Sequence, residues 1–204
     1  TGMSNGGELC YLLACEVPNV FRAFAPVAGT IFPNGLTNNI CSPTFPVPIF
    51  ETHGRNDNVT LIEGDPFDQY WGPYLGIDTI INFWVDHNSL TDLVVDTFPN
   101  LNNNNKITIS YKYSASNTNN EVWLYTHKSG HNWGDDGDVV IEEEIWDFFS
   151  KMSLNQSTFI EENYQSSRLI KVVDILGRKS NEKQNSLLFY IYDDGTVKKK
   201  IILE

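Results

Sequence analysis

Residues 47–60 read VPIFETHGRNDNVT, in which an apolar stretch ends at Gly54 and a polar segment follows. The stretch 47–53 is predicted to form a buried strand, as is RAFAPVAG at residues 22–29. EVWLYTH at residues 121–127 is a further predicted strand. Apolar runs that are buried on both faces are typical of parallel sheets covered by helices. The sequence therefore predicts an α/β fold with a mostly parallel sheet.

Three segments place apolar residues at helical spacing, namely residues 7–17, 76–89 and 138–152. In the first, Leu9, Leu12 and Leu13 are expected on the apolar face, with Cys10 and Ala14 filling in, and Pro18 ends the helix. Asp138 can cap the start of the last helix. These helices are expected to flank the sheet, and the predicted domain covers residues 1–152.

The character of the chain changes near residue 153. Residues 153–168 are polar and are predicted to form a linker, whereas residues 169–204 have the pattern of short strands separated by turns. Asp194-Gly195 between two apolar runs indicates a β-hairpin. We expect a separate, small, all-β C-terminal domain.

Composition excludes some classes of partner. The 204 residues have a formal net charge of −12 and are 41% hydrophobic, so a core can form but a basic surface is not expected. Nucleic acids and anionic membrane surfaces bind basic faces, so neither is a predicted partner. No apolar run approaches the length of about 18 residues that a transmembrane helix needs.

Gly2-Met3-Ser4-Asn5-Gly6 has the pattern G-x-S-x-G. In a nucleophile elbow this serine lies in a sharp turn between a strand and a helix, and flanking side chains would contact neighbouring backbone. A predicted helix follows at once. The pentapeptide is short, and an ordinary glycine-rich turn is the alternative.

The order of later residues favours the elbow. Asp57 follows the strand at 47–53, and His131 follows the strand at 121–127, so each lies where open α/β sheets place their sites. An α/β-hydrolase triad runs serine, acid, histidine. The imidazole removes the serine proton during attack, and the carboxylate orients the imidazole. Ser4, Asp57 and His131 are the predicted nucleophile, acid and base.

Other residues compete for these roles. The alternative acids are Asp65, Asp135 and Asp136. His53 is expected to shape the loop of the acid, while His87 and His127 are expected to be packed or surface histidines. Trp133, two residues after the base, is a candidate wall of the substrate pocket, and packing beneath the loop is an equal alternative.

The oxyanion hole needs two backbone donors, of which the N–H of Asn5 is one. The second belongs to a loop after an earlier strand. The chain begins directly with Thr1-Gly2, so we expect that the N-terminal strands of the catalytic domain precede it. We therefore expect the isolated chain to be inactive or nearly so.

The three cysteines, Cys10, Cys15 and Cys41, form no C-x-x-C pair, and no metal site is expected. One disulfide, for which we favour Cys15–Cys41 with Cys10 buried and free, fits a secreted protein. Three reduced thiols in the core are the alternative, because sequence does not determine connectivity.

Three separated blocks carry a family resemblance, at residues 1–30, 46–59 and 129–134. They read TGMSNGGELCYLLACEVPNVFRAFAPVAGT, PVPIFETHGRNDNV and SGHNWG, and together they resemble the secreted polyhydroxybutyrate depolymerase and feruloyl esterase group of α/β-hydrolases. The resemblance implies hydrolysis of polyester or plant hydroxycinnamate esters. It places the triad at Ser4, Asp57 and His131. Arg55 and Asn58 stand where such enzymes often have a small residue and a proline, which leaves the substrate open.

The tail, residues 171–204, is similar to the C-terminal sorting domain of the type IX secretion system of Bacteroidetes. KVVDILGR and YDDGTVKKK carry that resemblance. It implies recognition by the export machinery and an extracellular or cell-surface location. A small β accessory or carbohydrate-binding module is the alternative.

The sequence thus predicts a secreted serine carboxylic-ester hydrolase that forms an acyl-enzyme and needs no metal or organic cofactor. A serine peptidase of the same fold is the alternative within enzymes. A non-catalytic binding protein with a hydrolase fold, or an inactive fragment, is the alternative outside them.

Overall fold

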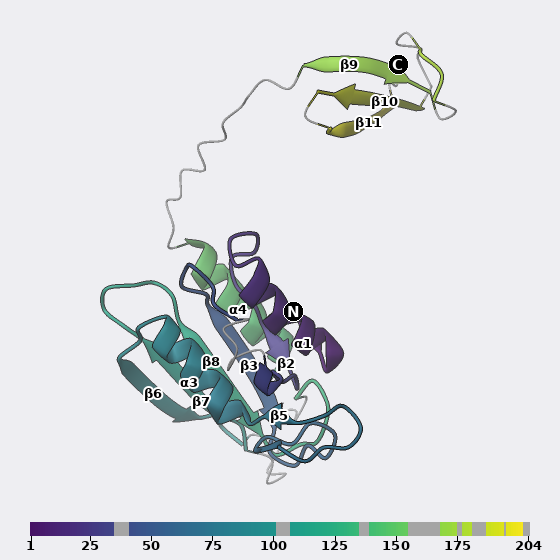
Figure 1. Cartoon of the computed structure of the whole chain (residues 1–204). Helices are drawn as coiled ribbons and strands as arrows, with labels where there is room; N and C mark the ends of the chain where they lie inside the picture. The colour runs from purple at the N-terminus through teal and green to yellow at the C-terminus, as the bar shows by residue number, and fades with distance from the viewer. Residues whose placement is uncertain are drawn as a thin grey trace. The chain divides into compact units, whose positions relative to one another are not determined.

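A computed structural model of the chain describes residues 1–34, 41–100, 107–134, 139–154, 168–174, 177–180, 187–193 and 195–201 (Figure 1). The chain divides into two compact units, Thr1–Gln156 and Ser157–Glu204, which are called unit 1 and unit 2 below. Unit 1 is mixed α/β around a mostly parallel sheet, and unit 2 is antiparallel. This coarse architecture confirms the prediction of an α/β unit followed by a β-rich one.

The central sheet of unit 1 has six strands in the order β1-β2-β3-β8-β7-β6. Their bounds are β1 Gly2–Met3, β2 Pro26–Val27, β3 Ile49–Gly54, β8 Val122–His127, β7 Ile109–Ser114 and β6 Asp92–Thr97. The first four strands are parallel to one another, and β7 and β6 complete the sheet as an antiparallel pair. The sequence did not predict β6, whose six residues are all exposed and give no burial pattern.

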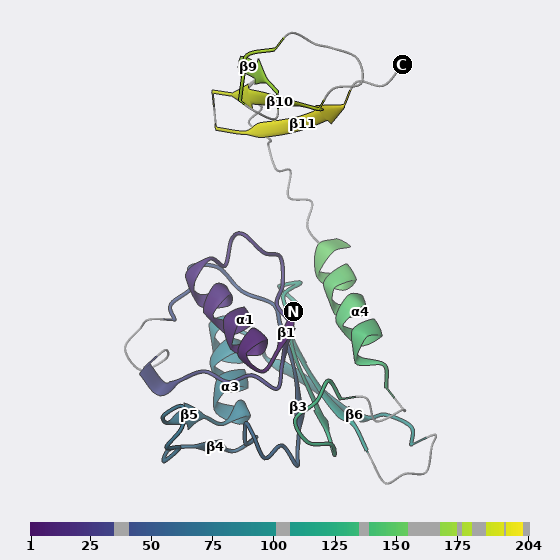
Figure 2. The same ribbon diagram turned by 90° about the vertical axis from the view of Figure 1, so that its right-hand side faces the viewer.

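Helices cover both faces of this sheet (Figure 2). α1 (Asn5–Glu16) and α3 (Ile77–His87) lie on one face, and α4 (Ile141–Leu154) lies on the other. Side chains alternate accordingly: Ile49 belongs to the core cluster on the α1 and α3 side, and Phe50 belongs to the cluster on the α4 side. Burying each such side chain contributes roughly 1.5–3 kcal/mol. All six residues of β3 are buried, because helices cover both of its faces.

The buried face of α1 differs from the prediction. Leu9 and Leu12 are 51% and 52% exposed, whereas Cys10, Tyr11 and Ala14 are buried. Expecting Leu9 and Leu12 to face the core was therefore wrong, whereas Leu13 packs, partly buried, against the core cluster. A close backbone approach at the start of α1 determines which face of the helix turns toward the sheet, and Leu9 and Leu12 lie outside that face.

Two glycines set that close approach. A Cβ atom on Gly7 would lie 2.9 Å from the carbonyl oxygen of Val27, and one on Gly29 would lie 2.7 Å from the carbonyl carbon of Gly7. Both distances are shorter than van der Waals contact, so the start of α1 and the segment after β2 pack backbone against backbone.

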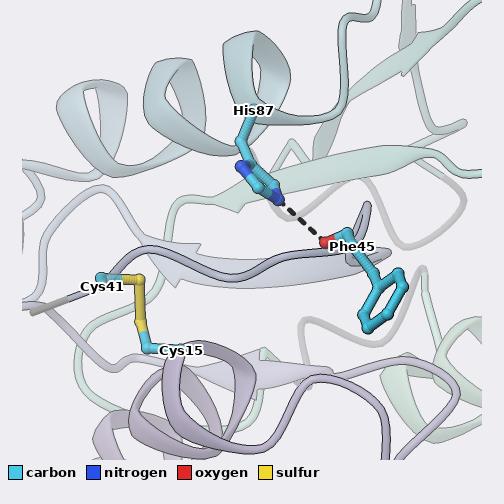
Figure 3. The surroundings of a disulfide bond; sticks show 4 residues. All are labelled: Cys15, Cys41, Phe45 and His87. Atoms are coloured by element: carbon cyan, nitrogen blue, oxygen red, sulfur yellow. Dashed lines mark hydrogen bonds between the residues drawn. A yellow bond between two sulfur atoms is a disulfide. The ribbon is translucent and has the colours of Figure 1, made fainter. Parts of the chain in front are cut away.

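A disulfide joins Cys15, in the last turn of α1, to Cys41, and Cys10 is a buried free thiol (Figure 3). In the same region, Nε2 of His87 lies 2.9 Å from the carbonyl oxygen of Phe45. The side chain of Asn88 bonds both backbone groups of Val47 at 2.8 and 2.7 Å. The end of α3 and the disulfide therefore hold the segment that enters β3.

Unit 2 is a three-stranded antiparallel sheet in the order β11-β10-β9. Its strands are β9 Leu169–Val173, β10 Leu187–Tyr192 and β11 Val197–Ile201. β10 and β11 form a hairpin at the predicted turn, in which Gly195 has a φ of 83° and Tyr192 N–H donates to the carbonyl of Thr196. Asp194 lies outside the described residues, as do most of the predicted linker and the predicted cap Asp138.

The helices of the described ranges are all too short or too polar to cross a membrane.

Gly7→Ala should lower the free energy of unfolding of unit 1 by about 1–3 kcal/mol, because the new methyl group forces α1 away from β2. Gly6→Ala is the matched control in the same helical turn, where a Cβ atom meets nothing within 4 Å. It should leave stability unchanged or raise it by up to about 1 kcal/mol. Urea unfolding followed by tryptophan fluorescence measures both, since all five tryptophans lie in unit 1. Equal effects of the two substitutions would contradict the close-packing account.

Candidate functional site

The residues predicted to act together follow three parallel strands of the sheet. Ser4 comes directly after β1, Asp57 lies three residues after β3, and His131 lies four residues after β8. Since the carboxyl ends of parallel strands share one edge of a sheet, all three residues lie at that edge.

Ser4 occupies a strained turn between β1 and α1. Its backbone has φ 56° and ψ −121°, and its N–H donates to the carbonyl of Val27 at 2.8 Å. Positive φ in a residue with a side chain costs of order 1–3 kcal/mol, and such strained residues cluster at functional sites. Ser4 is also the N-cap of α1, yet its side chain makes no capping hydrogen bond. The hydroxyl group is therefore not used to stabilise the helix.

The two glycines that flank Ser4 differ in what they do. A Cβ atom on Gly2 would lie 2.7 Å from the carbonyl carbon of Gly6, so Gly2 is required for the turn. A Cβ atom on Gly6 would meet nothing within 4 Å. Expecting a clash at Gly6 was wrong, and Gly7 is the helical glycine that the packing requires.

Asp57 bonds His131 directly. Its Oδ2 lies 2.8 Å from Nδ1 of His131, and its Oδ1 accepts the N–H groups of Val59 and Thr60 at 2.8 and 2.9 Å. The carboxylate side chain is fully buried, and the side chain of His131 is 17% exposed. Asp57 is thus held by its own loop, while the imidazole of His131 keeps access to the surface.

Backbone hydrogen bonds join the loop of the acid to the loop of the base. Arg55 N–H donates to the carbonyl of His127 at 2.7 Å, and Asn56 N–H donates to that of Ser129 at 3.2 Å. A Cβ atom on Gly54 would collide with the carbonyl oxygen of Gly130, so only glycine fits there. The two loops consequently form one connected piece of structure.

The Arg55 side chain bonds β8, the strand that precedes His131. Its guanidinium donates to the carbonyl oxygen and the hydroxyl of Thr126 at 2.6 and 2.8 Å. It also donates to the carbonyl of Ile107. The side chain therefore ties β8 and the chain before β7 to the acid loop.

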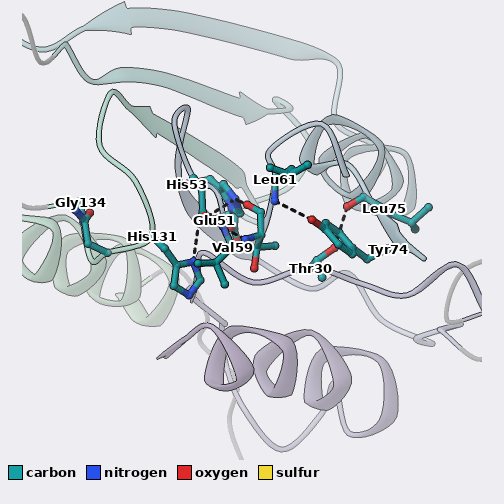
Figure 4. A network of polar contacts seen from close by, with 12 residues as sticks. Thr30, Glu51, His53, Val59, Leu61, Tyr74, Leu75, His131 and Gly134 are labelled. Carbon is teal, nitrogen blue, oxygen red and sulfur yellow. Dashed lines mark hydrogen bonds and ion pairs between the residues drawn. The ribbon is translucent and has the colours of Figure 1, made fainter. Parts of the chain in front are cut away.

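Glu51 and His53 belong to a buried polar network (Figure 4), which approaches Asp57. Glu51 and His53 are both 0% exposed, with Oε1 of Glu51 3.0 Å from Nδ1 of His53. Nε2 of His53 lies 2.8 Å from the carbonyl oxygen of Thr60 and 3.7 Å from Oδ2 of Asp57. The hydroxyl of Tyr11 donates to Oε2 of Glu51 at 2.9 Å. His53 thus contacts the acid loop, as expected, but Glu51 and Tyr11 were not predicted.

Burial is the largest influence on the pKa of Glu51 and of His53. It raises the pKa of the Glu51 carboxyl, against the effect of hydrogen bonds from His53, Tyr11 and the Gly29 N–H. Burial lowers the pKa of His53, but the bond and charge of Glu51, the Thr60 carbonyl and the charge of Asp57 together outweigh it and raise that pKa. Both groups therefore hold a proton more tightly in the folded protein.

The other candidate residues have different surroundings. Asp65 lies in β4 (Gly64–Asp65), which pairs with β5 (Tyr74–Leu75), and its Oδ1 accepts the N–H of Phe67. His127 is buried within β8. Trp133 is half-buried and packs against the core cluster on the α4 side. Asp135 and Asp136 lie outside the described residues.

A cavity of about 370 Å³ adjoins the turn of Ser4. Asn5 and Glu8 line it from α1, and Thr30, Ile31 and Phe32 line it from the segment after β2. Trp133 is not among the lining residues, so its role as a pocket wall stays a prediction. The described residues contain no group of three or more histidine, cysteine, aspartate or glutamate side chains that could hold a metal ion.

No protein-family model matches the chain, and no curated protein matches it.

The stability of unit 1 should fall as the pH rises above about 6.5, the pKa of an unfolded histidine. His53 has a raised folded-state pKa, so its contribution is complete below that value and is lost as the pH passes the higher folded-state pKa. His53→Gln should reduce this slope, and His87→Gln, the control, should retain it. Thermal midpoints by tryptophan fluorescence over a pH series measure both. Equal slopes in the His53→Gln variant and the unchanged protein would contradict the assignment.

Proposed function

We propose that unit 1 is a serine carboxylic-ester hydrolase with an α/β-hydrolase fold, in which Ser4 is the nucleophile, His131 the general base and acid, and Asp57 the orienting acid. Ser4 Oγ attacks the ester carbonyl while His131 accepts its proton. His131 then returns the proton to the departing alcohol. Water hydrolyses the acyl-enzyme by the same route.

The observation that carries the proposal is the 2.8 Å contact between Nδ1 of His131 and buried Asp57, at the sheet edge where Ser4 sits in a strained turn. A carboxylate can only accept a hydrogen bond, so the hydrogen in the contact with Asp57 lies on Nδ1 of His131. Nε2 of His131 then carries the lone pair that a general base needs. A surface histidine without such a partner has no defined tautomer.

The start of α1 supplies an oxyanion donor. The first intrahelical bond runs from Glu8 N–H to the carbonyl of Ser4, so the N–H groups of Asn5, Gly6 and Gly7 have no helical acceptor. The N–H of Asn5, next to Ser4, is the proposed donor, and the helix dipole favours negative charge there. One such donor is worth about a hundredfold in rate. The low activity expected of this chain alone stays a prediction.

The cavity beside Asn5 is suited to bind an uncharged, largely apolar part of the substrate, either its acyl group or its alcohol group. Leu9, Leu12, Ile31 and Phe32 supply most of its apolar lining, and Glu8 disfavours an anionic group. Polyesters of hydroxyalkanoates and esters of plant hydroxycinnamates both fit this description.

A fluorophosphonate probe tests the nucleophile. We expect the full-length protein to be labelled at Ser4 only, as located by peptide mass spectrometry, with labelling abolished in Ser4→Ala and reduced at least about a hundredfold in His131→Ala. Ser89, which also has a positive φ of 54°, provides the matched control, and Ser89→Ala should label normally. Label on another residue would refute the assignment. Hydrolysis of peptides in preference to matched esters would replace the esterase with a peptidase.

We propose further that the protein is exported and that unit 2 is recognised by type IX secretion machinery. Supporting observations are the small antiparallel sheet and the Cys15–Cys41 disulfide, since disulfides persist in oxidising compartments. Exposed lysines 198–200 on β11 offer a basic surface that differs from the acidic chain as a whole.

Deletion of residues 155–204 in the native host should abolish export while leaving unit 1 folded inside the cell envelope. Immunodetection of unit 1 in the medium and at the cell surface measures this. Ser89→Ala, in unit 1 and away from the deleted sheet, is the control and should be exported normally. Undiminished export after the deletion would discard the sorting role.

A further inference from the structure

Asp57 lies between two histidines. Its Oδ2 is 2.8 Å from Nδ1 of His131 and 3.7 Å from Nε2 of His53. The proposed reaction uses only His131, so the purpose of a second, fully buried histidine beside the acid is unexplained by it. Two carboxylates flank this second ring, because Glu51 faces its other nitrogen at 3.0 Å.

The hydrogen-bond partners determine where protons must be. The carbonyl oxygen of Thr60 can only accept, so Nε2 of His53 carries a hydrogen. Oε2 of Glu51 accepts from Tyr11, which leaves Oε1 to face Nδ1 of His53. One further proton must lie between these two atoms, since a bare carboxylate oxygen and a bare ring nitrogen would repel each other.

The surroundings favour placing that proton on the ring. The titratable groups that face the Glu51–His53 pair are Tyr11 and Cys10 of α1, Asp57 and, beyond Asp57, His131; Tyr74 faces Asp57 from β5. Of these, Asp57 is the neighbour nearest to His53 after Glu51. An imidazole between two carboxylates is stabilised as the cation by both.

We infer that His53 is a positioning residue whose ring, paired with Glu51, carries a positive charge 3.7 Å from Asp57 while its Nε2–H donates to the Thr60 carbonyl, so that this charge acts through Asp57 on His131. This inference rests on the proposed function of Ser4, Asp57 and His131. The charge of His53 offsets part of the negative field of Asp57 at His131. Removing the charge of His53 would therefore strengthen the attraction between Asp57 and a protonated His131.

The first test is spectroscopic and needs no turnover. In the full chain with labelled histidine nitrogens, both ring nitrogens of His53 should give protonated signals at pH 7, and Glu51→Gln should convert one of them to the unprotonated form. A His53 ring with a single N–H in the unchanged protein would overturn the inference.

The second test follows the rate of fluorophosphonate labelling of Ser4 against pH in the full-length protein. Glu51→Gln and His53→Gln should each move the acidic limb of that profile to higher pH by about half a unit. The shift is small because the charge of His53, which both variants remove, is partly offset at His131 by the charge of Glu51. The plateau rate at high pH should change little.

Tyr11→Phe is the matched control. It removes a hydrogen bond from the same buried network but leaves every charge near Asp57 in place, so it should lower the melting temperature without moving the acidic limb. A limb that moves equally in all three variants, or in none, would overturn the inference. Absence of label at Ser4 in the unchanged protein would overturn the proposed function and the positioning role with it, while the His53 signals would still report the buried charge.

Discussion

β3 and β8 run parallel and pair along six residues each, from Ile49 with Val122 to Gly54 with His127. The pairing continues past the ends of the strands, where Arg55 and Asn56 bond the segment that leads to His131. Without this register Asp57 and His131 could not meet, because a slip of one residue reverses the face on which every side chain lies. The pairing also holds Glu51 and Phe50 on opposite faces, one toward the polar network and one toward α4.

β3 carries both apolar and ionisable buried side chains. One face of β3, which α1 covers, carries Ile49, Glu51 and His53 in succession. It is therefore apolar at the beginning of the strand and ionisable near the carboxyl end. Burying such groups is costly unless each is paired, and here Tyr11, Thr60 and Asp57 provide the partners. The beginning of β3 thus contributes apolar packing, and its carboxyl end contributes buried ionisable groups that are all paired.

The candidate triad could be predicted because its members belong to local patterns: a glycine-flanked serine before a helix, and an acid and a histidine after strands. The coarse α/β architecture followed from the apolar runs in the same way. Glu51 and Tyr11 could not be predicted, because their contact joins residues 40 positions apart and depends on how α1 crosses the sheet. That crossing also explains why Leu9 and Leu12 were misplaced, since it depends on a backbone contact between Gly7 and Gly29 that leaves no periodic signal. β6 lacks any buried residue and so had no pattern to detect.

The buried thiol of Cys10 lies on the same helix as one half of the disulfide, five residues away. Thiol–disulfide exchange requires the thiolate, and burial, the largest influence, raises the pKa of Cys10. Few molecules therefore carry a reactive sulfur at this position, and the native fold protects Cys15–Cys41 against scrambling. In the unfolded chain Cys10 is as available for pairing as the other two cysteines, so the protection against mispairing begins only when α1 docks on the sheet.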